Sequence, residues 1–168
     1  MIPGMIDVSA ARAIPAAPDD IWALLDDPAR LGEWLAFADR GELLDGQGVG
    51  RRQRMHGRWG RKRSEIDQVV VEHDAPHRLA WRHEAERLDG RPAPRFAAST
   101  LFSMTLEPED GGATRVSLRS QQEPASRLRG LVIRLFGRRE VAGKLDESLD
   151  RLADRFAGER SRAPEAAA

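Results

Sequence analysis

The sequence contains no cysteine, and Lys62 and Lys144 are its only lysines among 27 basic residues. The absence of cysteine excludes disulfide bonds, thiolate metal sites and a cysteine nucleophile. The 27 acidic residues balance the 27 basic ones, so the formal net charge is zero. A chain without net charge gives no whole-molecule electrostatic argument for nucleic acid as a partner.

Long apolar runs are also missing. No stretch approaches the roughly 20 apolar residues of a transmembrane helix, and the N-terminus lacks the apolar segment of a signal peptide. We therefore expect a cytoplasmic protein without stable membrane insertion. The length of 168 residues fits a single domain. We place that domain at residues 1–157 and expect the polar, alanine-rich residues 158–168 to form a disordered tail.

Recognisable catalytic motifs are scarce as well. The four histidines show no metal-binding spacing, and Gly46, Gly48 and Gly50 lack the spacing of a phosphate-binding loop. No serine stands in a nucleophile-elbow motif. The sequence thus predicts no metal and no cofactor, it names no catalytic residue, and it leaves open whether any reaction is catalysed.

The longest periodic segment covers residues 124–156. Its apolar side chains recur at steps of three and four residues, which is typical of one stripe along an α-helix. The stripe consists of Leu128, Leu131 or Val132, Leu135, Ala142, Leu145, Leu149, Leu152 and Phe156. Pro124 suits the first turn of such a helix, and Gly137 predicts a kink or break near residues 136–138.

Upstream of this helix, the pattern predicts a strand over residues 5–14. It also predicts a short helix that starts at Pro18 and is stopped by Asp27 and Pro28, and a second short helix over residues 29–34. Turn signals then divide residues 37–122 into six further strands. Strands linked by hairpins, with helices at both ends, indicate an α+β fold with an antiparallel sheet. One face of this sheet should pack on the long helix.

Alternation along residues 51–73 assigns the two faces of one hairpin. A two-residue turn at Arg58 and Trp59 would pair Gln53 with Ser64. The face expected to point toward the helix then carries Gln53, Met55, Lys62, Ser64, Ile66, Gln68 and Val70. The opposite face carries the charged residues Arg52, Arg54, His56, Arg61, Arg63, Glu65 and Asp67. A single bulge would reverse this assignment.

Several motifs together resemble a known superfamily. They are residues 14–22 (IPAAPDDIW), residues 25–27 (LDD) with 31–34 (LGEW), the turn at residues 48–50, residues 74–82 (DAPHRLAWR) and the final helix at 145–152. The chain is similar to the START-like or SRPBCC superfamily, and within it to the polyketide cyclase/dehydrase and lipid-transport group. This resemblance implies the helix-grip fold, in which a curved seven-stranded antiparallel sheet wraps around the C-terminal helix and leaves a cavity. Members bind lipids, sterols, polyketides, quinones or hormones; some are cyclases and others are co-chaperones.

The resemblance and the strand alternation together give a predicted ligand-binding set. It consists of Gln53, Met55, Ile66, Gln68, Trp81, His83, Thr100, Phe102, Met104, Leu118, Ser120, Leu128, Leu131 and Leu135. The alternative is that the apolar members form an ordinary core and that His83 is a satisfied core or rim histidine. The expected partner is a hydrophobic small molecule, bound by a monomer or a dimer. A competing hypothesis is a protein-interaction module, either co-chaperone-like or a ribosome-associated or quinone-pathway factor, that holds no ligand.

Residues 51–63 carry seven basic side chains and no acidic one. They could form an anion-binding patch. A solvated outer strand face is the better interpretation, because Trp59 is the only aromatic residue there to stack on a base. Trp59 could instead cover the mouth of the cavity. Glu65 and Asp67 lie among arginines, which favours surface ion pairing over a catalytic carboxylate pair.

Overall fold

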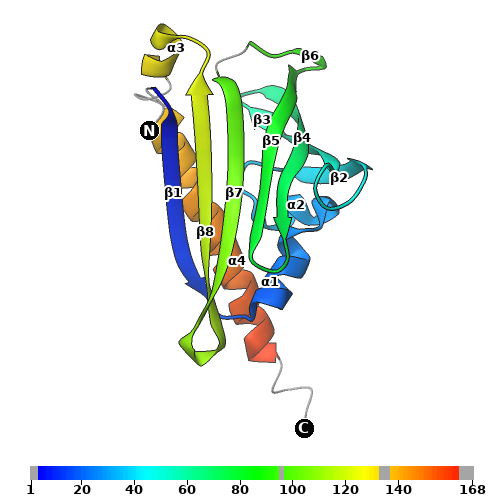
Figure 1. The fold of residues 1–168 in the computed structure, drawn as a ribbon, viewed down its shortest axis with the longest axis vertical. Coiled ribbons are helices and arrows are strands. Elements are labelled where there is room, and N and C mark those ends of the chain that lie inside the picture. The colour runs from blue at the N-terminus through cyan, green and yellow to red at the C-terminus, as the bar shows by residue number, and fades with distance from the viewer. Residues whose placement is uncertain (1–3, 95–96, 133–136, 163–168) are drawn as a thin grey trace.

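The computed structural model describes residues 4–94, 97–132 and 137–162. Within these residues, one antiparallel sheet has the strand order β1-β8-β7-β5-β4-β3-β2, and a short β6 pairs with β5 alone. The strands are β1 (Ile6–Ile14), β2 (Arg40–Asp45), β3 (Arg52–Trp59), β4 (Lys62–Asp74), β5 (Arg78–Leu88), β6 (Arg91–Pro92), β7 (Ala97–Glu109) and β8 (Ala113–Pro124). Figure 1 shows the sheet as one curved layer with the long helix across one face.

Helices occupy the connections and the C-terminal part. Between β1 and β2 lie α1 (Pro18–Leu25), the 3-10 turn η1 (Pro28–Arg30) and α2 (Leu31–Trp34), and η2 (Asp110–Gly112) joins β7 to β8. After β8 come α3 (Arg127–Val132) and α4 (Arg138–Arg162). This architecture confirms the predicted helix-grip fold. Among the described residues, no helix is long and apolar enough to cross a membrane.

The α4 helix holds the centre of the core. Its buried side chains are Leu145, Ser148, Leu149, Leu152 and Phe156, all from the predicted stripe or beside it. They meet the inward residues of the sheet and the apolar faces of α1 and α2 in one continuous cluster. The helix is therefore held by burial of one face rather than by propensity alone.

The prediction of one helix over residues 124–156 is wrong at both ends. Pro124 closes β8, opposite Ala97 of β7, and does not begin a helix. The described chain has two helices here, and α4 starts at Arg138, where the break was predicted. At its other end α4 continues to Arg162, past the predicted domain end at residue 157. Residues 163–168 of the predicted tail lie outside the described residues.

The β3–β4 hairpin turns later than predicted. Trp59 pairs with Lys62, so Gly60 and Arg61 form the loop, and Gln53 pairs with Gln68 instead of Ser64. Gly60 has φ of +60°, which suits the first position of a tight hairpin turn. The two registers differ by an even number of residues, so each side chain keeps its predicted face. Lys62 is the exception to the predicted burial, because it is exposed at the tip.

Arg51 departs from the predicted solvated basic face. It is only 6% exposed, and its Nη1 donates to Asp26 Oδ1 over 2.7 Å. His73 Nε2 lies 3.0 Å from the same carboxylate and packs edge-on against Trp22. This cluster attaches the C-terminal end of α1 to the sheet.

Ser148 joins α4 to the segment that follows α2. Its Oγ accepts a hydrogen bond from the backbone N–H of Ala36 over 2.9 Å and donates one to the Lys144 carbonyl over 2.7 Å. We predict that Ser148→Ala lowers the free energy of unfolding by about 1–2 kcal/mol, because the buried Ala36 N–H loses its acceptor. Urea denaturation measures the change. Ser161→Ala, which removes an exposed hydroxyl bonded only to the Ala157 carbonyl, is the matched control, and equal effects of the two variants would contradict the prediction.

Candidate functional site

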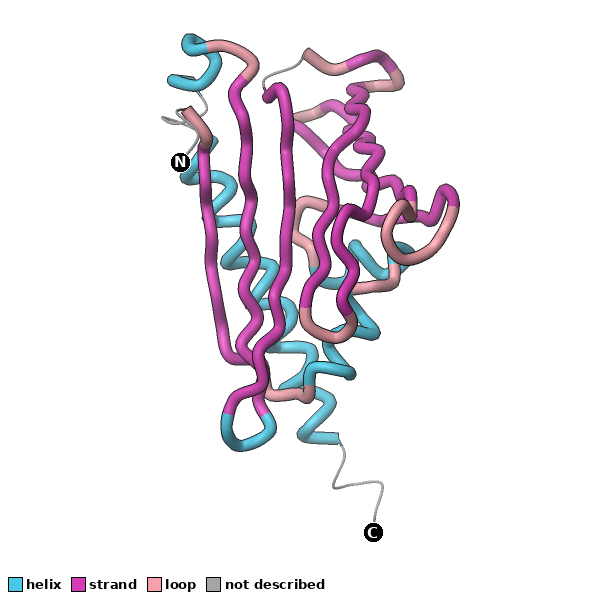
Figure 2. Tube along the Cα trace, in the orientation of Figure 1, coloured by secondary structure: helices cyan, strands magenta, loops and turns pink. Residues whose placement is uncertain are grey.

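A cavity of about 470 Å³ lies between the sheet and the first turn of α4. β5 pairs with β7 only from Arg78 to Arg82, although β5 continues to Leu88, so the two strands separate above this ladder (Figure 2). The described lining residues are Leu35, Phe37, Met55, Arg58, Trp59, Ser64, Ile66, Gln68, Trp81, His83, Glu86, Arg87, Leu88, Ala93, Ala97, Thr100, Phe102, Ser120, Gln122, Gly137, Glu140 and Val141.

Aromatic side chains make one wall of this cavity. Trp81 on β5 and Phe102 on β7 are cross-strand partners whose rings stack with centroids 5.1 Å apart and planes 16° apart. Phe37 meets Phe102 edge-to-face at 6.5 Å. Such pairs are stabilising geometries for aromatic rings, so the wall is both apolar and fixed in place.

A close backbone approach positions Phe37. A Cβ atom on Gly57 of β3 would lie 2.5 Å from the Phe37 carbonyl oxygen, so only glycine lets this segment cross the strand so closely. Ser148 holds the neighbouring Ala36 from the other side. The segment between α2 and β2 thus brings Leu35 and Phe37 to the cavity from outside the sheet.

Polar side chains form a row on the cavity side of the sheet, two residues along the strands from Trp81 and Phe102. Gln53 pairs with Gln68, Gln68 with His83, and Thr100 with Gln122 in successive ladders. Gln53 Nε2 donates to Gln68 Oε1 over 2.9 Å, which keeps these two buried amides bonded to each other. The cavity therefore has an apolar wall and a defined polar band.

His83 and Glu86 form a hydrogen-bonded pair on the cavity lining. His83 Nδ1 lies 3.0 Å from Glu86 Oε1, and the side chains are 17% and 43% exposed. The hydrogen bond from His83 lowers the pKa of Glu86, against the opposing effect of burial. Glu86 is thus a carboxylate at neutral pH, and it holds the imidazole ring in place.

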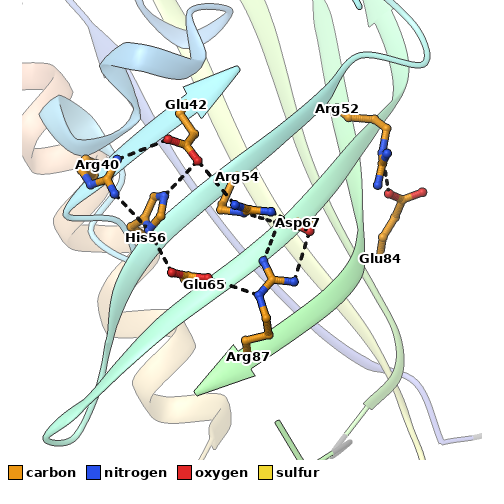
Figure 3. Close-up of polar contacts among 9 residues, drawn as sticks. All are labelled: Arg40, Glu42, Arg52, Arg54, His56, Glu65, Asp67, Glu84 and Arg87. Atoms are coloured by element: carbon orange, nitrogen blue, oxygen red, sulfur yellow. Dashed lines mark hydrogen bonds and ion pairs between the residues drawn. The ribbon is translucent and has the colours of Figure 1, made fainter. Parts of the chain in front are cut away.

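The opposite face of the same strands carries an ion-pair network (Figure 3). Asp67 lies at its centre and receives hydrogen bonds from Arg54 Nε at 2.6 Å and Arg87 Nη2 at 2.9 Å. Burial raises the pKa of Asp67, but the hydrogen bonds and charges of the two arginines outweigh it and lower the pKa to about 2. Glu65 joins through Arg87, as the ion-pairing interpretation predicted. This network belongs to the outer surface, and of the residues drawn in Figure 3, Arg87 alone is also among the described lining residues of the cavity.

The structure brings together part of the predicted ligand-binding set. The members on the cavity lining are Met55, Ile66, Gln68, Trp81, His83, Thr100, Phe102 and Ser120. Gln53, Met104 and Leu118 are buried at 1% exposure or less in the core and do not line it. Leu128 and Leu131 are 76% and 53% exposed on α3, which corrects their assignment to the lining. Leu135 lies outside the described residues.

Several lining residues were not predicted from the sequence. Gly137, Glu140 and Val141 take the place that we had predicted for the stretch from Leu128 to Leu135. Leu35 and Phe37 come from a connecting segment whose position depends on Gly57. Glu86 reaches the lining through a bulge that alternation does not reveal. Trp59, half exposed, does lie on the lining, so the suggestion that it covers the mouth agrees with its position.

The sequence matches the family described as polyketide cyclase/dehydrase and lipid transport over residues 5–157. This match covers most of the chain. The protein belongs to this family. The sheet, the two short helices after β1 and the C-terminal helix that borders a cavity agree with the family's fold.

Solved structures share this fold at low sequence identity. A protein from Thermus thermophilus has a TM-score of 0.71 at 21% identity, over 92% of this chain and 99% of that one. A START superfamily protein from Mycobacterium smegmatis has a TM-score of 0.70 at 11% identity, over 90% and 97%. The major latex-like protein 151 of Panax ginseng has a TM-score of 0.68 at 11% identity, over the same shares. No curated protein matches the sequence.

Proposed function

We propose that this member of the polyketide cyclase/dehydrase and lipid-transport family binds an apolar or aromatic small molecule in the cavity between the sheet and α4. The observation that carries the proposal is the cavity of about 470 Å³, which lies within the range of small-molecule sites in proteins. The family and the fold support hydrophobic ligands as a class.

The lining has the composition expected of a ligand site. Phe37, Trp81 and Phe102 offer flat apolar surface, and Met55 adds an adaptable side chain. A few polar groups, among them Thr100, stand beside them and can fix the orientation of a bound molecule. An ordinary core would fill this volume with side chains at close-packed density.

The first experiment asks whether a ligand is present. The protein is purified from its host under native conditions and denatured, and the released small molecules are identified by mass spectrometry. Titration calorimetry then measures the affinity for a fatty acid, a quinone and a polycyclic aromatic compound. We expect at least one of these classes to bind.

The matched variants are Phe102→Trp and Leu131→Trp. Phe102 lies on the aromatic wall, so a larger ring there takes up cavity volume and should weaken binding by about tenfold or more. Leu131 is exposed and off the lining, so the same new side chain there should leave the affinity unchanged. If none of the three compound classes binds to the wild type and no small molecule is released on denaturation, the cavity is not a ligand site. The hypothesis of a protein-interaction module is then the better one.

A further inference from the structure

A β-bulge in β5 re-aims one carboxylate into the cavity. His83 pairs with Gln68 and Ala85 pairs with Asp67, so Glu84 is an extra residue between two consecutive partners. Strict alternation from His83 would put Ala85 and Arg87 on its face. The bulge instead places Glu86 opposite Ile66, on the cavity side. The Glu84 side chain accepts a hydrogen bond from Arg52 Nε on the outer face. Bulges that redirect a side chain in this way are frequent next to functional sites.

The result is a histidine whose two ring nitrogens have different roles. Nδ1 is bonded to Glu86 Oε1 at 3.0 Å, and a carboxylate can only accept, so Nδ1 carries the proton. In the neutral imidazole, Nε2 is then a hydrogen-bond acceptor. Within the described part of the chain, His83 Nε2 makes no hydrogen bond. It is also not one of the fully buried side-chain atoms without a partner there, which means that the atom itself is exposed. It is therefore accessible on a residue that lines the cavity.

The basic side chains near this pair do not compete for it. Arg87 is directed to the outer face, where it bonds Glu65 and Asp67. Arg58 is exposed and lies near Asp39. Among the described residues, Glu86 is thus the one charged group bonded to His83.

The aromatic wall lies directly beside this histidine. Trp81 is two residues before His83 on the same face of β5, a distance of about 7 Å along a strand. Its stacking partner Phe102 stands two residues after Thr100 on β7. A ring seated against Trp81 and Phe102 can therefore direct a substituent along β5 to His83.

We propose that His83 Nε2, oriented by Glu86, accepts a hydrogen bond from a hydroxyl group on a ring-bearing ligand. The preferred ligands are then phenols or other hydroxylated ring compounds rather than plain hydrocarbons or their ethers. This inference rests on the proposed function, because it requires that the cavity holds a ligand.

The test compares 2-naphthol with its methyl ether, 2-methoxynaphthalene, in fluorescence titrations of the protein. The two probes share the same rings, but only the naphthol can donate a hydrogen bond to Nε2. We expect the wild type to bind the naphthol about tenfold more tightly than the ether. In His83→Phe the ratio of the two affinities should fall to about one, and in Glu86→Gln the ratio should be smaller than in the wild type.

Glu84→Gln is the matched control, because it makes the same change as Glu86→Gln on the outer face of the same strand. It should keep the wild-type preference. The ratio of the two affinities is the readout, so a general loss of stability or cavity shape, which affects both probes, does not imitate the result. Equal binding of both probes to the wild type, or an unchanged preference in His83→Phe, overturns the role of His83 but leaves ligand binding intact. If neither probe binds, and the broader set of compounds also fails, the proposed function itself is wrong.

Discussion

Leu149→Ala is expected to lower the free energy of unfolding by about 2–5 kcal/mol, the range for a buried leucine that leaves a cavity. Leu149 is 1% exposed and lies in the middle of the buried face of α4. Leu145 and Leu152, the neighbours along that face, have no exposure. Because they are held by close packing on all sides, they can move only partly into the gap that the leucine leaves. Much of the transfer and cavity cost should therefore be realised.

Urea denaturation of wild type and variant measures this change. Leu128→Ala removes the same atoms from a leucine that is 76% exposed, and it should stay within about 0.5 kcal/mol of the wild type. Equal changes in the two variants would show that α4 is not packed on the sheet as described.

The sequence predicted the arrangement of elements well, because each signal was local and repeated. In the β3–β4 hairpin the turn was misplaced at Arg58 and Trp59, yet the faces came out right. Side chains alternate with a period of two, so a register error of an even number of residues moves pairs along the strand without turning them over. Met55 and Ile66 face each other on the cavity side although neither was expected to pair with the other.

The errors arise where the determining contact is distant. The helical spacing of Leu128 and Leu131 matched a buried stripe, but it could not show that α3 leaves both side chains exposed. Phe37 reaches the cavity because Gly57, far along the chain, lacks a Cβ atom. The bulge that turns Glu86 inward depends on how β5 pairs with β4. Loop positions and bulges of this kind are set by tertiary packing and leave no periodic signal.

The outer-face network gives a second large effect. We predict that Asp67→Asn lowers the free energy of unfolding at pH 7 by about 2–3 kcal/mol, because it leaves Arg54 and Arg87 without their shared counter-charge. The Asp67 side chain is 10% exposed, so solvent screens its ion pairs only weakly. Its pKa of about 2, against an ordinary value of 3.8, corresponds by linkage to about 2 kcal/mol of stabilisation.

The same linkage fixes the pH dependence. The folded state holds the pKa of Asp67 below its unfolded value, so this stabilisation is fully present above about pH 4 and is lost as the pH falls through about 2. The difference between wild type and Asp67→Asn should therefore shrink progressively between pH 4 and pH 2. Denaturation curves for both proteins at several pH values across this window measure it.

Glu84→Gln is the control for this experiment too. Glu84 pairs with Arg52 on the same face of the sheet, but the two side chains are 34% and 52% exposed. An exposed pair of this kind contributes about 0–1 kcal/mol, so the variant should change stability little at any pH in the window. If Asp67→Asn behaves like Glu84→Gln at pH 7, burial has not strengthened the central ion pairs. The outer face would then be an ordinary charged surface, and the hairpin that carries Met55 and Ile66 would be held by its backbone ladder and its cavity-side packing.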